Sequence, residues 1–542
     1  MRLLLCLCFL ALSQLVSASR FELPADTSDT GFLDKTALPA KMLAARHEFN
    51  ENNMRGALIL YREILQSEPT NAPALYWTAQ CHYRLKRYDL AKEYLSRAVA
   101  VDPKVNSEVN FFYGKIHHRL AELDSAEYFY DLFIKNHPNS RSFEFEDAQK
   151  FIRECEFAKE MMAAPVNASI ENMGRNINSR FDDYAPSITA DGKMIVFTSR
   201  RSDTEGGEID EGGDYKFYED IFFSTWNESK KEWAIARGVE GAVNTPTYDA
   251  VLSVSPDGSE MFIYKNNQNS QGDIFKSVYN KHDEAWRAPE KLPKPINTSY
   301  FESSISITAD GNTVYFISER PEGQGQGDIY TSNKNSGGSW SKPKNLGALI
   351  NTELDEKFVF IHPNGKTLFF ASDGHQCLGS YDIFRTEFVN GQWGIPVNLG
   401  YPINTVNEES TFSMTSNNKT MLLAAEYEDS FGERDIYLID VSEYKLLSGG
   451  FDVSAYGTLV LTVTDEAGKA VKDADVIITP NGSDRVLISQ NTAKTGRVKV
   501  NLPGNVVYDI KVRSKRVSGE LTFKLPMDGE GGNVHSETIV IK

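Results

Sequence analysis

Short apolar runs recur through the middle of the chain, each directly after a turn. The runs lie at residues 194–199, 260–265, 313–318, 367–372 and 420–425. Dipeptides such as Asp191-Gly192 and Asn364-Gly365 precede them, and these tolerate positive φ and favour tight hairpins. Continuous apolar runs of this length are typical of strands buried on both faces. The pattern therefore predicts five central β-strands.

A second strand, opening with aspartate, isoleucine and an aromatic residue, follows each apolar run. The aspartates are Asp220, Asp273, Asp328, Asp382 and Asp435, at steps of 53, 55, 54 and 53 residues. A fixed period of roughly this length, built from short strands, is typical of a propeller-type array. We therefore expect residues 170–445 to form a five-bladed, WD40-like β-propeller.

The fifth unit lacks an ending that the other four share. Each of those four closes with a tryptophan-marked strand and a segment that ends in Asn-Thr, as at 239–245 and 292–298. A related segment, residues 172–179, stands ahead of the first unit instead. We expect it to complete the last blade, which would close the ring and leave no open sheet edge.

A helical repeat precedes the strands. Small residues recur at Ala45, Ala79 and Gly114 and at Ala57, Ala91 and Ala126, and prolines recur at Pro69, Pro103 and Pro138. All three series step by 34 and then 35 residues, which is the tetratricopeptide (TPR) pattern of paired antiparallel helices. Residues 143–162 predict one more helix, which would cap the apolar end. We expect residues 38–164 to form a TPR α-solenoid.

Aromatic and histidine side chains on the first helices are candidates for the concave face of this solenoid. They are Tyr76, His82, Tyr83, Tyr113 and His117. Two roles remain open for them: packing between helices, or lining a groove for a peptide or partner helix. A metal pair at His117 and His118 is not favoured, because adjacent helix positions point in different directions.

From Gly457 onward, apolar and polar residues alternate as in half-buried strands. We expect residues 457–542 to form a small, transthyretin-like β-sandwich. The predicted fold class is thus multidomain α + β, with a TPR α-solenoid, a five-bladed β-propeller and a C-terminal β-sandwich.

The five repeated aspartates favour a structural role, each fixing its own blade, because a single binding site would need only one set of ligands. The alternative is that their carboxylates gather at the axis and bind a cation. An insertion at residues 200–220, rich in Gly, Asp and Glu, predicts a solvated loop. Calcium binding or partner docking is its alternative role.

The net charge and the N-terminal residues restrict the possible partners and the cellular location of the protein. The net charge of −18 and the pI near 5.1 argue against nucleic acid and against an anionic membrane surface. Residues 1–18 have the pattern of an export signal, with cleavage between Ala18 and Ser19. No later segment is apolar enough to span a bilayer. We expect a periplasmic, outer-membrane-associated protein.

Three cysteines follow the signal: Cys81, Cys155 and Cys377. This sparse, odd set is not a disulfide framework. Cys81 and Cys155 fall in helical patterns and are best explained as buried small hydrophobes, with a Cys81–Cys155 bridge as the alternative.

No catalytic motif is present: the sequence has no HExxH, no GxSxG and no P-loop. We therefore predict no catalytic residues, no metal site, no cofactor and no enzymatic activity. The predicted function is a scaffold for protein–protein contacts in the cell envelope. The alternative is a propeller that binds a glycan or cation, as a sensor or carbohydrate-active protein, through carboxylates such as Glu302, Asp355, Glu356 and Glu408.

The order of modules resembles that of Bacteroidota envelope proteins with TPR, WD40-like propeller and carboxypeptidase regulatory-like domains. Residues 172–201, the Asp-Ile-aromatic series and the Ile-Asn-Thr endings carry the resemblance, together with Asp465, Gly468, Gly496 and Tyr508 in the last module. It implies envelope protein partners and association with the type IX secretion system. The OmpA-like domain of that family has no counterpart here, so direct peptidoglycan anchoring is not expected; the chain is either a shorter paralogue or a truncated form.

Overall fold

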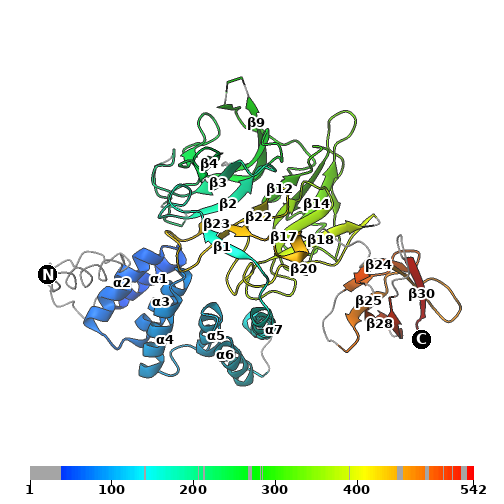
Figure 1. The fold of residues 1–542 in the computed structure, drawn as a ribbon. Coiled ribbons are helices and arrows are strands. Elements are labelled where there is room, and N and C mark those ends of the chain that lie inside the picture. The colour runs from blue at the N-terminus through cyan, green and yellow to red at the C-terminus, as the bar shows by residue number, and fades with distance from the viewer. Residues whose placement is uncertain are drawn as a thin grey trace, which may run out of the picture.

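The chain consists of N-terminal TPR-like helical repeats followed by a large β-rich region (Figure 1). The computed structural model describes residues 38–542 apart from 139–141, 206, 211–213, 266–271, 281, 284, 390, 449–455, 483–487, 504–505, 516 and 526–533. The predicted export signal, with Ala18 and Ser19, lies outside the described residues.

The helices pack as antiparallel pairs. In the N-terminal region they are α1 (Leu38–Asn50), α2 (Met54–Ser67), α3 (Ala72–Arg84), α4 (Tyr88–Val101), α5 (Val109–Arg119), α6 (Leu123–Asn136) and α7 (Phe143–Ala163), the last of which packs against α6. A further short helix, α8 (Lys445–Ser448), lies later in the chain. The small residues of the repeat are buried where paired helices cross, as predicted. At Gly114 a Cβ atom would lie 2.5 Å from the Tyr130 ring, so only glycine permits this approach of α5 to α6.

Between residues 169 and 440 the β-rich region contains five antiparallel sheets within the described residues, numbered along the chain from residue 183 onward. Sheet 1 holds β2 (Asp183–Ile188), β3 (Met194–Ser199), β4 (Asp220–Asn227), β5 (Glu232–Trp233) and β6 (Arg237–Gly238). Sheet 2 holds β7 (Asp249–Val254), β8 (Glu260–Lys265), β9 (Asp273–Asn280), β10 (Ala285–Trp286) and β11 (Glu290–Lys291). Sheet 3 holds β12 (Ser304–Ile307), β13 (Thr313–Ser318), β14 (Asp328–Asn333) and β15 (Lys344–Asn345).

Sheets 4 and 5 continue the series. Sheet 4 holds β16 (Glu356–Ile361), β17 (Thr367–Ser372), β18 (Asp382–Val389), β19 (Gln392–Trp393) and β20 (Val397–Asn398). Sheet 5 holds β21 (Phe412–Met414), β22 (Thr420–Ala425), β23 (Asp435–Asp440) and β1 (Ser169–Asn172). The predicted apolar runs are the second strands, and the Asp-Ile-aromatic segments begin the third strands. The single predicted fourth strand is split in sheets 1, 2 and 4 into two short strands that both pair with the third strand.

The segment ahead of the first unit completes the last sheet, as predicted, but its strand lies at Ser169–Asn172 and shares only Asn172 with the predicted segment 172–179. β1 pairs antiparallel with β23, with Asn172 opposite Tyr437 and Ile170 opposite Ile439. In Figure 1 the two strands lie side by side although they come from opposite ends of the β-rich region. The edge of β23 is thereby covered, which removes a row of unpaired backbone groups.

An asparagine clamp fixes each third strand to the segment that follows it. The asparagine side chain accepts a hydrogen bond from the backbone N–H of the isoleucine and donates one to its carbonyl oxygen. The clamp pairs are Asn244–Ile221, Asn297–Ile274, Asn351–Ile329 and Asn404–Ile383. In sheet 5 the clamp comes from Asn178, at 2.8 and 2.9 Å from Ile436, so the N-terminal segment supplies this element too.

Backbone hydrogen bonds join sheet 1 to sheet 2, sheet 3 to sheet 4 and sheet 4 to sheet 5. Glu219 O accepts from Asp249 N at 3.0 Å, and Tyr381 O accepts from Glu409 N at 2.9 Å. The same bond runs from Asp183 N in sheet 1 to Arg434 O in sheet 5, at 2.9 Å. The last sheet is therefore joined to the first by the same kind of bond that joins these three neighbouring pairs.

The C-terminal part holds two sheets around one apolar core. The strands are β24 (Tyr456–Thr464), β25 (Asp475–Pro480), β26 (Ile488–Asn491), β27 (Arg497–Pro503), β28 (Val507–Ser514), β29 (Val517–Lys524) and β30 (Val534–Val540). Sheet β27-β24-β30 and sheet β26-β25-β28-β29 bury Leu461, Ile478 and Ile510 between them. Leu349 and Ile395 of the preceding region pack against this core.

The remaining cysteines are free and buried. Cys81 lies on α3, Cys155 on α7 and Cys377 in the loop between β17 and β18. The expectation of buried small hydrophobes is confirmed, and the alternative Cys81–Cys155 bridge is not formed.

The asparagine clamp on β23 gives a stability prediction. Asn178→Ala leaves the buried Ile436 N–H without its partner, although the Ile436 carbonyl still accepts from Met173 N; an unpaired buried donor typically costs about 1–3 kcal/mol. We expect the variant to unfold at a lower urea concentration than the natural chain, with unfolding monitored by tryptophan fluorescence. The control is Asn335→Ala, which removes an exposed turn hydrogen bond to Ser339; equal midpoints for the two variants would contradict the clamp's role.

Candidate functional site

One face of the first helices α1, α3 and α5 is lined by residues at three repeat positions. In each helix they are spaced i, i+4 and i+7, so they share a side. They are Met42, Arg46 and Phe49; Tyr76, Gln80 and Tyr83; and Phe111, Lys115 and His118. We call these nine residues the first-helix face.

Aromatic rings and cations alternate on this face. The Arg46 guanidinium lies 3.4 Å from the centre of the Trp77 ring. Arg84, at the rim, lies 4.4 Å from the Phe49 ring, and Lys115 lies 5.0 Å from the Tyr83 ring. Stacking of cations on aromatic faces is favourable and holds the side chains in place.

The five residues predicted for a concave groove divide between two environments. Tyr76 and Tyr83 belong to the first-helix face, where both rings contact Phe112 of α5. His82 stacks on Tyr94 of α4, and His117 stacks on Phe129 of α6; in both pairs the ring centres lie 5.2 Å apart. Tyr113 also stacks on Phe129, at 4.7 Å, and its hydroxyl donates to Ser96 Oγ at 3.2 Å. These last three pack against second helices.

Sequence reasoning missed Arg46, Arg84 and Lys115. A signal was present, because Arg46, Gln80 and Lys115 each follow one of the small residues Ala45, Ala79 and Gly114 and so repeat with the same period. The sequence prediction considered only tyrosines and histidines. The importance of the basic residues Arg46 and Lys115 follows from the aromatic rings that they contact in the structure.

The solenoid meets the β-rich region at the end of the first-helix face. His118 Nε2 lies 2.9 Å from Leu378 O, and the Arg119 guanidinium donates to Val406 O. Leu378 and Val406 are buried in one apolar cluster with residues of α5, α6 and α7. The predicted cap helix α7 therefore packs against the β-rich region as well as against α6. Lys86 and Lys150 pair with Glu426 and Asp373 at 3.0 and 3.8 Å.

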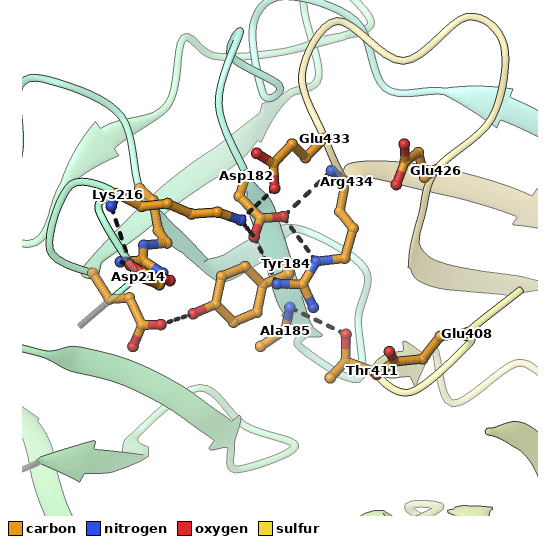
Figure 2. A network of polar contacts seen from close by, with 12 residues as sticks. Asp182, Tyr184, Ala185, Asp214, Lys216, Glu408, Thr411, Glu426, Glu433 and Arg434 are labelled. Carbon is orange, nitrogen blue, oxygen red and sulfur yellow. Dashed lines mark hydrogen bonds and ion pairs between the residues drawn. The ribbon is translucent and has the colours of Figure 1, made fainter. Parts of the chain in front are cut away.

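A polar network joins sheet 1 to sheet 5 where the last sheet meets the first (Figure 2). Both carboxylate oxygens of Asp182 accept from Arg434, at 2.8 Å each, and Lys216 lies 3.7 Å away. The Arg434 guanidinium also lies 4.1 Å from the centre of the Tyr184 ring. Although burial raises the pKa of Asp182, Arg434 and Lys216 hold it below its ordinary range. Asp182 is thus a buried anion held by a bidentate partner.

The five repeated aspartates are buried at the starts of their third strands. Four of them accept a hydrogen bond from a backbone N–H: Asp220 from Glu205, Asp328 from Gln324, Asp382 from Leu378 and Asp435 from Phe431. Asp273 instead accepts from the side-chain ammonium of Lys291. Each bond links an aspartate to its own sheet. These contacts are those of residues that fix local structure.

In each sheet a second carboxylate stands at the start of the first strand or just before it. These five carboxylates differ in whether a cation pairs with them. Asp183, Asp249 and Glu302 pair with Arg201, Lys265 and Arg320. Among the described residues, Glu356 and Glu409 have no Lys or Arg partner in ion-pair range. Glycine stands at 374 and tyrosine at 427, two residues beyond the second strand, where Arg201 and Arg320 stand in sheets 1 and 3.

Burial raises the pKa of Glu356 to about 8 and that of Glu409 to about 7. Thr352 N and Oγ1 donate to Glu356 at 3.0 and 2.9 Å. Thr405 N and Oγ1 donate to Glu409 at 2.8 and 2.7 Å. The charge of Arg119, from the solenoid, opposes the effect of burial at Glu409. The solenoid thus supplies a cation close to a buried acid of sheet 5.

The insertion at 200–220 includes residues outside the described ones, 206 and 211–213. Asp214 pairs with Arg200, and Asp210 accepts from the Tyr248 hydroxyl. These two carboxylates are therefore held by protein donors.

Within the part of the chain that the structure describes, no group of three or more His, Cys, Asp or Glu side chains is arranged to hold a metal ion. No described helix is long and apolar enough to cross a membrane.

Comparison with known proteins supports the helical repeats. A tetratricopeptide repeat family model matches residues 49–116. The first TPR domain of Spaghetti (RPAP3), solved with an HSP90 peptide, is similar at 20% identity and a TM-score of 0.21, over 24% of this chain and 98% of that one. No curated protein matches the chain.

Two solved structures cover about half of the chain. TolB of Acinetobacter baumannii is 16% identical, with a TM-score of 0.30, over 49% of this chain and 56% of that one. A luciferin-regenerating enzyme is 11% identical, also with a TM-score of 0.30, over 51% and 95%.

The raised pKa of Glu356 gives a pH prediction. The folded state holds this proton to a higher pH than the unfolded chain does, so stability falls as pH rises from about 5 to about 8. Glu356→Gln keeps an acceptor for Thr352 N and removes the charge. We expect it to flatten this slope and to stabilise the chain at pH 8, on the order of 2 kcal/mol. An unchanged slope in urea unfolding measured across this range would contradict the assignment.

The junction gives a second prediction. Arg119→Met keeps most of the apolar stem but loses the bond to Val406 O and the charge that opposes the effect of burial on the pKa of Glu409. We expect faster hydrogen exchange in residues 377–380 and 405–409, because the solenoid no longer holds these loops. The control is Arg97→Met, whose partner Glu93 lies on its own helix; comparable exchange in both variants would show that Arg119 does not hold the junction.

Proposed function

We propose that the chain is a non-catalytic scaffold that holds other proteins of the cell envelope. TPR repeats are modules that bind protein partners, and rigid repeats present a preorganised surface, which lowers the ordering cost of association. The observation that carries the proposal is the first-helix face. Phe49, Tyr76 and Phe111 are buried in the solenoid. Arg46, Gln80, Tyr83 and Lys115 are half-buried, and the rings that Arg46 and Lys115 contact belong to the solenoid.

We further propose that the five successive sheets are the blades of a WD40-like β-propeller and that the C-terminal sheets form a carboxypeptidase regulatory-like β-sandwich. The backbone bond from Asp183 to Arg434 and the pairing of β1 with β23 support a closed ring. The two sheets around the Leu461 core support a sandwich. The module order then corresponds to a PorE-like envelope protein.

The proposed setting is the periplasm, in association with the outer membrane and the type IX secretion system. The export-signal pattern at residues 1–18 and the module order support this assignment. Envelope proteins are the proposed partners.

Site-specific photo-cross-linking tests the scaffold role. A photoreactive phenylalanine at position 80, on the first-helix face, is expected to give discrete adducts with envelope proteins in cells. The same residue at position 62, on α2 and exposed, is expected to give none. Absence of any adduct specific to position 80, with the chain folded and exported, would contradict the proposal.

A further inference from the structure

We propose that the solenoid is held on sheets 4 and 5 by a pH-sensitive latch: it docks while Glu154 is protonated, and it swings away about residues 164–168 when Glu154 ionises. This device goes beyond the proposed scaffold function and needs no partner protein. Its central residue is an acid of α7 that is buried at the junction between the solenoid and the sheets.

The solenoid is attached to the β-rich region by one short connection and a small docking surface. Residues 164–168 lead from α7 to β1. Val166 N in this connection donates to Tyr401 O at 2.7 Å, and β1 is paired with β23, so the far end of the connection is fixed to the sheets. Among the described residues, four solenoid side chains make the polar contacts of the docking surface: Lys86, His118, Arg119 and Lys150. A short segment between two rigid bodies permits rotation once such contacts are lost.

Glu154 is a carboxylate in this docking surface that lacks hydrogen-bond donors. It is 4% exposed, and neither of its oxygens accepts a hydrogen bond from a described residue. Lys150 stands one helical turn earlier on α7, and its Nζ lies 3.5 Å from Glu154 Oε1 and 3.8 Å from Asp373 in the loop between β17 and β18. Residues four apart lie on the same side of a helix, so Glu154 faces that loop and shares Lys150 with Asp373.

The charged and titratable groups around Glu154 come from every element packed against it. They are Lys150 and Cys155 on α7, Arg119 on α5, Tyr130 on α6, Asp373 and Cys377 between β17 and β18, and Asp382 at the start of β18. Burial raises the pKa of Tyr130, Cys155 and Cys377, so these three side chains stay neutral. The cations available to an ionised Glu154 are Lys150 and Arg119, and each also serves another acceptor. A buried carboxylate with so little compensation opposes docking.

The direction of the pH effect follows from the proton on Glu154. Burial raises the pKa of Glu154 to about 7, and Lys150 and Arg119 limit the rise. An exposed glutamate has a pKa of about 4.3, so the docked state holds the proton to a higher pH than the undocked state does. Docking is therefore fully supported below about pH 4 and is lost as the pH rises through about 7; between pH 5.5 and 8.5 its equilibrium constant falls roughly thirty-fold. His118 does not contribute, because burial lowers its pKa to about 3.

Two other buried acids near the junction, Glu409 and Asp382, belong to the sheets. Burial raises the pKa of both. Glu302 in sheet 3 and Asp273 in sheet 2 hold the equivalent positions, and both are fully buried there, although the described docking contacts lie on sheets 4 and 5. Burial at these positions thus comes from the sheets themselves and persists when the solenoid leaves. Glu154 is the acid whose surroundings change on undocking.

The test compares hydrogen exchange in the natural chain and in Glu154→Gln, which keeps the shape of the protonated acid, at pH 5.5 and pH 8.5. Three segments report docking: residues 377–380, 405–409 and 426–431, which meet the solenoid through His118, Arg119 and Lys86. At pH 8.5 we expect the natural chain to exchange about tenfold faster than the variant, or more, in all three segments. At pH 5.5 we expect the two chains to exchange equally. Comparison at the same pH cancels the intrinsic pH dependence of exchange.

The matched control is Glu156→Gln, the same change at an exposed position of α7, which should follow the natural chain at both pH values. Equal exchange in the natural chain and in Glu154→Gln at pH 8.5 would overturn the latch. A difference confined to residues 377–380 would also overturn it, because Glu426 meets a different turn of the solenoid and responds only if the solenoid moves as a whole.

Two further measurements keep the latch open to refutation. Glu409→Gln should leave the pH dependence in place, and loss of the dependence in that variant would refute the assignment to Glu154. If Glu154→Gln does not fold, as judged by circular dichroism, the natural chain decides the question alone. Its exchange in the three segments, corrected for the intrinsic pH dependence, must be faster at pH 8.5 than at pH 5.5, and an unchanged corrected rate would overturn the proposal.

Discussion

The structure depends on one segment, residues 169–183, which connects α7 to β2. It adds the edge strand β1 to sheet 5, places the Asn178 clamp on Ile436, and brings Asp182 to Arg434 and Asp183 to the Arg434 carbonyl. Without it, sheet 5 would expose the edge of β23 and would lose the bonds that Asp182 and Asp183 make to Arg434. Because the same segment follows α7, closing the series of sheets also sets where the solenoid is attached.

The junction between solenoid and sheets shows how the repeat pattern is adapted. Sheets 1 to 3 supply a cation to the carboxylate that leads their first strand, whereas the described residues of sheets 4 and 5 supply none. At position 374 a side chain would collide with Thr352 Oγ1, 1.9 Å from a Cβ atom, so glycine there is required by packing. At sheet 5 the solenoid brings Arg119 close to Glu409. The repeat is thus altered where another part of the chain docks, and the buried acids there retain their protons at higher pH.

Much of the architecture could be predicted because it follows from periodic sequence. Small residues such as Gly114 mark helix crossings, and the Asp-Ile-aromatic series marks third strands, so both repeats were found from spacing alone. The role of 172–179 followed from an ending that the fifth unit lacks. By contrast, the contact of His118 with Leu378 links residues far apart in sequence that belong to different repeats, and no period encodes it. The environment of individual side chains could not be predicted from the period either. His82 and His117 lie on first helices, but they pack inward because they stack on Tyr94 and Phe129 of second helices.

The most direct test of the account is disulfide formation across β1 and β23. In a chain whose native cysteines are replaced by alanine, Glu171→Cys with Leu438→Cys places two cysteines at paired Cα positions. The pairing of β1 with β23 predicts rapid and complete cross-linking under mild oxidation. Glu171→Cys with Ile439→Cys is shifted by one residue to the opposite face and should cross-link much less. Failure of the 171–438 pair to form, or equal formation of both pairs, would contradict closure by the N-terminal segment.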